Sequence, residues 1–112
     1  MNNSNSAVLD EPQTRTKDKP KSRILPPYNV ILMNDDHHSV VYVVNMLKKI
    51  FGYSDEKGMK MAKEIHETGR CIVWTGSKEL GELKQEQIHS YGPDKLVAQC
   101  KGSMTAILEP SV

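Results

Sequence analysis

The sequence predicts an α+β fold, in which a small three-stranded antiparallel sheet packs on three helices in the order β-α-α-β-α-β. Two observations lead to this fold class. Short β-branched and apolar runs alternate with longer segments whose apolar residues recur at helical spacing. The runs also lie too close together in the sequence for three right-handed βαβ crossovers, which favours strands on one side and helices on the other.

The chain begins with a polar stretch, residues 1–25, that is rich in Asn, Ser, Thr, Lys and Pro. Because it contains few apolar side chains, it cannot bury enough surface to offset the entropy that is lost on ordering. We therefore expect residues 1–25 to form a flexible N-terminal extension and residues 26–112 to form one folded domain. The doublet Pro26-Pro27 stiffens the entry to this domain and disfavours a helix there.

The first strand is expected at residues 28–33 (YNVILM), which are apolar and partly β-branched. Ser39 is positioned to cap the helix that follows, and Gly52 ends that helix. The helix carries one continuous apolar stripe at helical spacing, formed by Val40, Val43, Val44, Leu47 and Phe51.

A second helix is expected from Ser54 to Thr68-Gly69, since Ser54 is followed by two acidic residues and Gly69 is a typical helix end. This helix places His66 near its C-terminal end. Its residues at helical spacing are Gly58, Met61, Ala62 and Ile65.

The second strand is expected at residues 70–75 (RCIVWT), and Gly76-Ser77 precedes a third helix that ends before Gly92-Pro93. Residues 92–103 form a long loop, and residues 104–109 (MTAILE) form the last strand. We expect the third helix to face inward with Leu80, Leu83, Ile88 and Tyr91.

The composition is that of an ordinary soluble domain, with 26% charged and 38% apolar residues and a net charge of +1. This charge gives no reason to expect nucleic acid or an anionic membrane as a partner. No apolar run is long enough to span a bilayer, and the N-terminus lacks the apolar region of a secretory signal. The two cysteines, Cys71 and Cys100, form no CxxC pair, which favours a reduced cytoplasmic protein.

The turn between the first strand and the first helix, residues 34–39 (NDDHHS), holds one amide, two carboxylates and two imidazoles. We expect no metal there, because His37 and His38 are adjacent and not at the i, i+4 spacing that places two imidazoles on one helical face. We expect no catalysis and no other cofactor either, since the chain contains neither a GxSxG nucleophile nor a Gly-rich phosphate loop.

Two interpretations of this polar turn remain open. An ammonium group has three N–H donors, and an Asn oxygen, an Asp carboxylate and a neutral His nitrogen supply the matching acceptors beside an apolar cavity lined by the valine-rich helix. Alternatively, the turn is an ordinary helix start, in which the acidic residues complement the helix dipole and Asn34 forms an Asx turn.

The segment PPYNVILMNDDHHSVVYVV at residues 26–44, the Ile-His pair at 65–66 and GRCIV at 69–73 resemble the ClpS adaptor family over residues 26–109. This resemblance implies a monomeric, cytoplasmic adaptor that is not an enzyme. It would bind the free N-terminal residue of N-degron proteins (Leu, Phe, Tyr or Trp) and deliver them to the N-terminal domain of an AAA+ Clp unfoldase of the ClpA or ClpC type, coupled to ClpP. The alternative is a ClpS-like interaction domain that docks on the unfoldase but has lost or changed its N-degron specificity.

The resemblance also implies roles for individual residues. The family positions that bind the substrate α-amino group correspond to Asn34, Asp35, Asp36 and His66. The positions that line the hydrophobic pocket correspond to Leu32, His38, Val40, Val43, Ala62, Ile65 and Met104. The positions that dock on the unfoldase correspond to Glu79, Glu82 and Lys84, and the extension at residues 1–25 matches the segment used for delivery.

The chain departs from the family pattern at the pocket. Val40 and Ala62 stand where Met is common, and His38 replaces a small hydroxyl residue. Because Val and Ala are shorter than Met, we expect a roomier pocket that suits Phe, Tyr or Trp and is less strict against Ile and Val.

Overall fold

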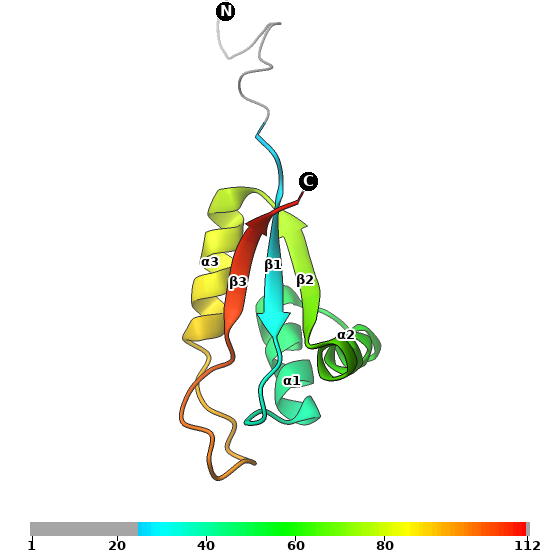
Figure 1. Cartoon of the computed structure of the whole chain (residues 1–112), viewed down its shortest axis with the longest axis vertical. Coiled ribbons are helices and arrows are strands. Elements are labelled where there is room, and N and C mark those ends of the chain that lie inside the picture. Colours follow the sequence, from blue (N-terminus) through cyan, green and yellow to red (C-terminus); the bar gives the residue numbers. More distant parts are fainter. Residues whose placement is uncertain (1–24, 112) are drawn as a thin grey trace, which may run out of the picture.

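The strands form one antiparallel sheet in the order β2-β1-β3, in a computed structural model that describes residues 25–111 (Figure 1). The central strand β1 (Tyr28–Met33) pairs on one side with β2 (Arg70–Gly76) and on the other with β3 (Ala106–Pro110). The predicted extension at residues 1–25 lies, apart from Leu25, outside the described residues.

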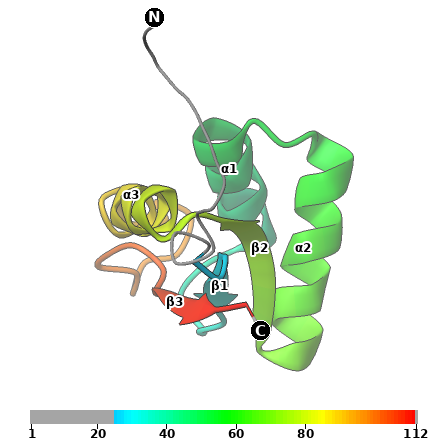
Figure 2. The same ribbon diagram turned by 90° about the horizontal axis from the view of Figure 1, so that it is seen from above.

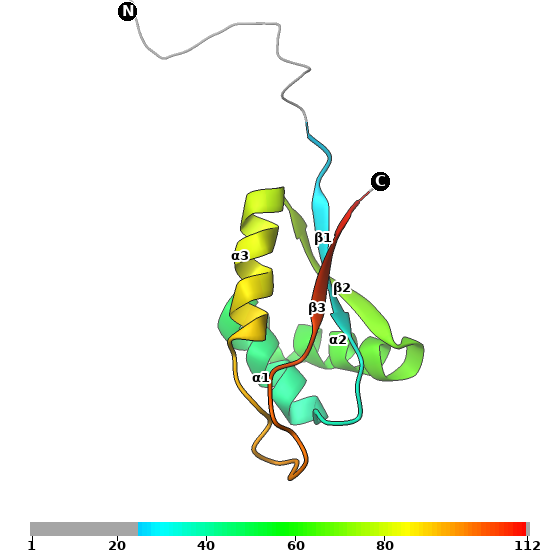
Figure 3. The same ribbon diagram turned by 60° about the vertical axis from the view of Figure 1, so that its left-hand side comes forward.

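The predicted element order is confirmed, with helices α1 (Val40–Phe51), α2 (Asp55–Thr68) and α3 (Lys78–His89). Viewed from above, α1 and α3 lie on one side of the sheet and α2 runs beside the edge strand β2 (Figure 2). The view toward the β3 edge shows α3 and α1 on the same side of β1 and β3 (Figure 3).

The helix limits follow from local capping. The hydroxyls of Ser39, Ser54 and Ser77 accept hydrogen bonds from backbone N–H groups in the first turns of α1, α2 and α3, at 3.2, 3.1 and 3.3 Å. Gly52 and Gly69 end α1 and α2 in the left-handed conformation, with φ of 74° and 92°, and each donates its N–H to the last helical turn. Because these signals are local, the predicted helix starts are correct.

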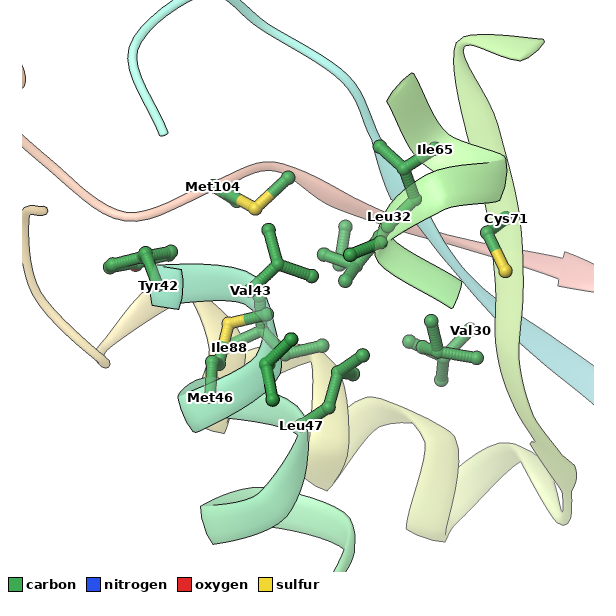
Figure 4. Close-up of a cluster of buried hydrophobic side chains, with 14 residues drawn as sticks. Val30, Leu32, Tyr42, Val43, Met46, Leu47, Ile65, Cys71, Ile88 and Met104 are labelled. Atoms are coloured by element: carbon green, nitrogen blue, oxygen red, sulfur yellow. The ribbon is translucent and has the colours of Figure 1, made fainter. Parts of the chain in front are cut away.

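The hydrophobic core lies between the sheet and the helices (Figure 4). β1 contributes Val30 and Leu32, and α1 contributes Met46 and Leu47, all of them fully buried. Burying a side chain of this size contributes about 1.5–3 kcal/mol, so α1 is held mainly by this apolar face. Other core members are Val43, Ala62, Ile65, Cys71, Val73, Ile88, Met104 and Ala106.

The predicted inward face of α3 is wrong at two positions. Leu80 and Leu83 are 53% and 47% exposed, whereas Gly81 and Ile88 are buried. A Cβ added to Gly81 would lie 2.7 Å from Cδ1 of Leu108, so the missing side chain lets α3 lie close to the sheet. Helical spacing alone selected the leucines, whereas in the structure α3 turns the face that carries Gly81 toward the sheet. Tyr91, the other predicted position, lies beyond the helix end and packs partly buried against the core.

The last strand begins later than predicted. Met104 is buried but precedes β3, which starts at Ala106. The outer edge of β3 is covered by α3, since Gln85 Nε2 donates to Ala106 O (2.9 Å) and His89 Nε2 accepts from Ala106 N–H (3.0 Å). These bonds satisfy strand groups that no fourth strand pairs.

We expect Gly81→Val to lower the free energy of unfolding by about 1–3 kcal/mol more than Glu82→Val, because it places a side chain where α3 touches the sheet. Val is a better helix former than Gly and a slightly poorer one than Glu, so helix propensity alone would favour the Gly81 variant, and Glu82 is exposed. Urea unfolding followed by circular dichroism would measure the difference. Equal losses in the two variants would contradict this packing argument.

Candidate functional site

The first residue of the polar turn and the strand residue before it are joined by backbone hydrogen bonds to two other segments. Asn34 N–H donates to Gly69 O (2.9 Å), at the C-terminal end of α2, and Met33 N–H donates to Thr105 O (3.0 Å), just before β3. His66 lies one helical turn before Gly69, so the bond from Asn34 brings the turn and the predicted histidine to the same end of the molecule.

The predicted polar residues differ in how they are engaged. Asn34, Asp36 and His66 are exposed, and no hydrogen bond from within residues 25–111 engages their side chains. Asp35 is one-third exposed, and its Oδ1 accepts hydrogen bonds from His37 N–H (2.8 Å) and His38 Nδ1 (2.7 Å). The turn and the end of α2 therefore present unengaged amide, carboxylate and imidazole groups beside one carboxylate, that of Asp35, which is held in place.

An apolar groove of about 370 Å³ lies between the start of α1 and α2. It is lined by Val40, Met59, Lys60, Lys63 and His66. Val40 and Met59 are exposed, and lysines commonly contribute apolar stems while their charged ends stay in water. The groove can thus take an apolar group while His66 offers a hydrogen-bonding nitrogen at its wall.

The other predicted pocket residues lie deeper. Of the predicted lining, only Val40 borders this groove, and it is exposed although it begins the apolar stripe predicted for α1. Leu32, Val43, Ala62, Ile65 and Met104 are buried in the core; all but Ala62 are labelled in Figure 4. An apolar pattern indicates burial but does not separate a cavity wall from a core position, so their role as a wall stays a prediction.

His38 does not border the groove. Its side chain is 4% exposed, and Nε2 lies 2.8 Å from Gly102 O and 3.3 Å from Cys100 Sγ. The ring also packs against Tyr42, with 4.6 Å between ring centroids. His38 therefore connects the polar turn to the loop at residues 92–103, a contact that nothing in the local sequence indicated.

Asp94 in the same loop holds the start of α1. It is 3% exposed, and its carboxylate accepts hydrogen bonds from Ser39 N–H (2.6 Å) and Leu96 N–H (2.9 Å). Burial acts to raise the pKa of Asp94, but these donors outweigh it and leave the pKa below its usual value. Sequence reasoning missed this residue, because a Pro-Asp pair in a loop is typical of an exposed turn.

The cysteines, a possible metal site and a possible membrane-spanning helix are the remaining features to consider. Both cysteines are free thiols, and burial, together with Glu64, raises the pKa of Cys71 to about 12, which makes it unreactive. Within the described part of the chain, no group of three or more His, Cys, Asp or Glu side chains is arranged to hold a metal ion. None of the helices in residues 25–111 is long and apolar enough to cross a membrane.

The predicted docking residues lie on α3, but only the acidic ones are available. Glu79 and Glu82 are exposed, whereas Lys84 Nζ donates to Ile50 O (2.8 Å) near the C-terminal end of α1. Lys84 therefore stabilises a helix end instead of presenting a free charge. The exposed residues Leu80 and Leu83, which sequence reasoning placed inside, add an apolar surface beside the two glutamates.

Comparisons with known proteins show which sequences this chain is similar to. A family model described as "ATP-dependent Clp protease adaptor protein ClpS" matches residues 24–96. The ClpS adapter protein of Pectobacterium carotovorum is 33% identical over 89 residues, which cover 78% of this chain and 84% of that protein. The ClpS of Vibrio atlanticus is 32% identical over 79 residues, covering 69% and 74% of the two chains.

A solved structure shares the fold. The structure of Agrobacterium tumefaciens ClpS2 bound to L-phenylalaninamide superposes with a TM-score of 0.66 at 24% sequence identity. The match covers 77% of this chain and 98% of that chain. The arrangement of sheet and helices is therefore common to both.

We expect Asp94→Ala to lower the free energy of unfolding at neutral pH by about 1–3 kcal/mol, because Ser39 N–H and Leu96 N–H lose their acceptor. The pKa of Asp94 is lowered in the folded state, so its contribution is complete above the unfolded value and disappears as the pH falls through the folded value. The gap between the variant and the wild type should therefore shrink below about pH 4. Urea unfolding across pH measures this gap, with exposed Glu67→Ala as the control; a gap that stays constant would contradict the argument.

Proposed function

The chain belongs to the ClpS family of adaptor proteins of the ATP-dependent Clp protease, and we propose that it binds the free α-amino group and the bulky hydrophobic side chain of N-degron proteins and delivers them to an AAA+ Clp unfoldase for degradation by ClpP. The observation that carries this proposal is the apolar groove with His66 at its wall, next to the polar turn at residues 34–39. Such a site matches a ligand that joins an ammonium group to an apolar side chain.

The polar turn would hold the ammonium group. Asn34 and His66 are exposed and offer an amide oxygen and an imidazole nitrogen as acceptors. Asp35 and Asp36 would supply counter-charge and a contact to the first peptide unit. Hydrogen bonds to charged groups contribute about 1.5–3 kcal/mol each, so the amine would account for much of the affinity.

The groove would hold the side chain of the N-terminal residue. Val40 and Met59 provide exposed apolar surface at its mouth. The buried residues behind the groove, Leu32, Val43, Ala62, Ile65 and Met104, would line a deeper pocket when a side chain enters. L-phenylalaninamide, the ligand of the Agrobacterium ClpS2 structure, has a free amine and a benzyl group, which supports Phe as a residue recognised here. Leu, Tyr and Trp are proposed beside Phe as other bulky apolar side chains.

The unfoldase would dock on α3. The exposed side chains of Leu80 and Leu83 stand beside Glu79 and Glu82, which gives an apolar centre with an acidic border. An apolar centre of this kind would contribute more to binding the N-terminal domain of a ClpA- or ClpC-type unfoldase than the charged residues alone. The reason is that most of the binding energy of an interface comes from its buried centre. The adaptor would act as a monomer without catalytic activity, and its two free thiols suit a reducing cytoplasm.

A second candidate is a ClpS-like domain that docks on the unfoldase but has lost or changed its N-degron specificity. The burial of Leu32, Ala62 and Met104 within the core favours it, because these side chains would have to open for a pocket to form. The two candidates share the docking surface and differ only in binding of the peptide.

Fluorescence anisotropy with a labelled peptide that begins with Phe would separate the two candidates. We expect binding that weakens at least about tenfold per lost hydrogen bond when the amine is acetylated, because acetylation removes the charge and two donors. The substitutions Asn34→Ala and His66→Ala should weaken binding of the free-amine peptide and leave binding of the acetylated peptide unchanged. A folded chain that binds neither peptide but still binds the unfoldase N-terminal domain would support the second candidate.

We expect Leu80→Ser combined with Leu83→Ser to weaken binding to the unfoldase N-terminal domain at least about tenfold and to leave peptide binding unchanged. Both leucines are exposed, so the two substitutions should lower the free energy of unfolding only slightly. Ile72→Ser is the matched control, since Ile72 is similarly exposed but lies on β2. Isothermal titration calorimetry measures both interactions, and unchanged unfoldase affinity in the double variant would refute this docking surface.

A further inference from the structure

The geometry points to His38 as a positioning residue for the amine site: we propose that it holds the carboxylate of Asp35 in the orientation that a substrate ammonium requires, and that the loop at residues 92–103 holds His38. This inference rests on the proposed function above. It gives a role to a histidine that stands in the polar turn but does not border the groove.

The carboxylate of Asp35 is held on one side only. Its Oδ1 accepts hydrogen bonds from His38 Nδ1 at 2.7 Å and from His37 N–H at 2.8 Å. No donor in the described part of the chain reaches Oδ2, and the side chain is one-third exposed. With Oδ1 occupied by two donors, the plane of the carboxylate is set and Oδ2 is left for a ligand.

His38 is in turn held by the loop. At the opposite side of the ring, Nε2 lies 2.8 Å from Gly102 O and 3.3 Å from Cys100 Sγ. Tyr42 packs on the ring and donates its hydroxyl hydrogen to Gly92 O (2.6 Å), at the other end of the same loop. The ring cannot turn without breaking contacts at both nitrogens, so its orientation relative to Asp35 is fixed by the fold.

Because the ring is already oriented before a ligand binds, less conformational entropy is lost when the Asp35 carboxylate becomes ordered around that ligand. The neighbouring residue His37 provides a comparison within the same turn. Its side chain is exposed, and only its backbone N–H contacts Asp35. Position 38, and not position 37, therefore places an imidazole where it can set the direction of the carboxylate.

A double-mutant cycle tests whether His38 acts through Asp35. The variants are His38→Leu, Asp35→Asn and the two combined, each measured by anisotropy with the labelled Phe peptide. We expect His38→Leu to weaken binding about tenfold and Asp35→Asn to weaken it at least as much, whereas the combined variant should be no weaker than Asp35→Asn alone. Losses that multiply would show a merely structural role and overturn the proposal.

Two further variants keep the test independent of folding. His38→Asn retains an amide donor near the position of Nδ1 while it loses the link to Gly102, so it should bind more tightly than His38→Leu; equal or weaker binding would overturn the proposal. His37→Leu is the matched control and should bind like the wild type, and a tenfold loss there would also overturn it. Binding of the unfoldase N-terminal domain should be unchanged in every variant, which shows that the chain remains folded.

The outcome also separates this inference from the proposed function. A wild-type chain that binds the free-amine peptide, together with a His38→Leu variant that binds it equally well, would overturn the role of His38 alone. A wild-type chain that binds no free-amine peptide would overturn both.

Discussion

The candidate site depends on one backbone hydrogen bond, from Asn34 N–H to Gly69 O at 2.9 Å. It joins the end of the central strand to the end of α2, and these segments are 35 residues apart in the sequence. Because Gly69 terminates α2 one turn after His66, the bond brings the polar turn close to the histidine. Neither partner depends on a side chain, so the turn can vary in sequence while its position is kept.

The loop at residues 92–103 supports the same turn from the other side. Asp94 accepts the N–H of Ser39 at the start of α1, and Gly102 and Cys100 contact the ring of His38. A loop usually carries function on a rigid scaffold, whereas here it helps to build the scaffold of the turn. The polar turn therefore lies between two elements, α2 and this loop, that hold opposite sides of one short segment.

Much of the fold was predictable, because its elements are decided by near neighbours. The serines at 39, 54 and 77 cap the helices, and the glycines at 52 and 69 end two of them. The face of α3 was not predictable from spacing, since Gly81 allows close contact with Leu108 and so leaves Leu80 and Leu83 outside. A pattern of apolar residues does not reveal which neighbour has room to approach.

The sequence by itself determined the strands, the helices, their caps and the concentration of polar groups in the turn at residues 34–39, because each depends on residues within a few positions of one another. Only the tertiary structure decided what those groups contact. His38 meets Gly102 across 64 positions, and Lys84 meets Ile50 across 34. Such contacts between distant residues depend on how whole helices, strands and loops pack together, and a local sequence pattern does not contain this information. The same packing determines whether a polar side chain is exposed or already hydrogen-bonded within the protein.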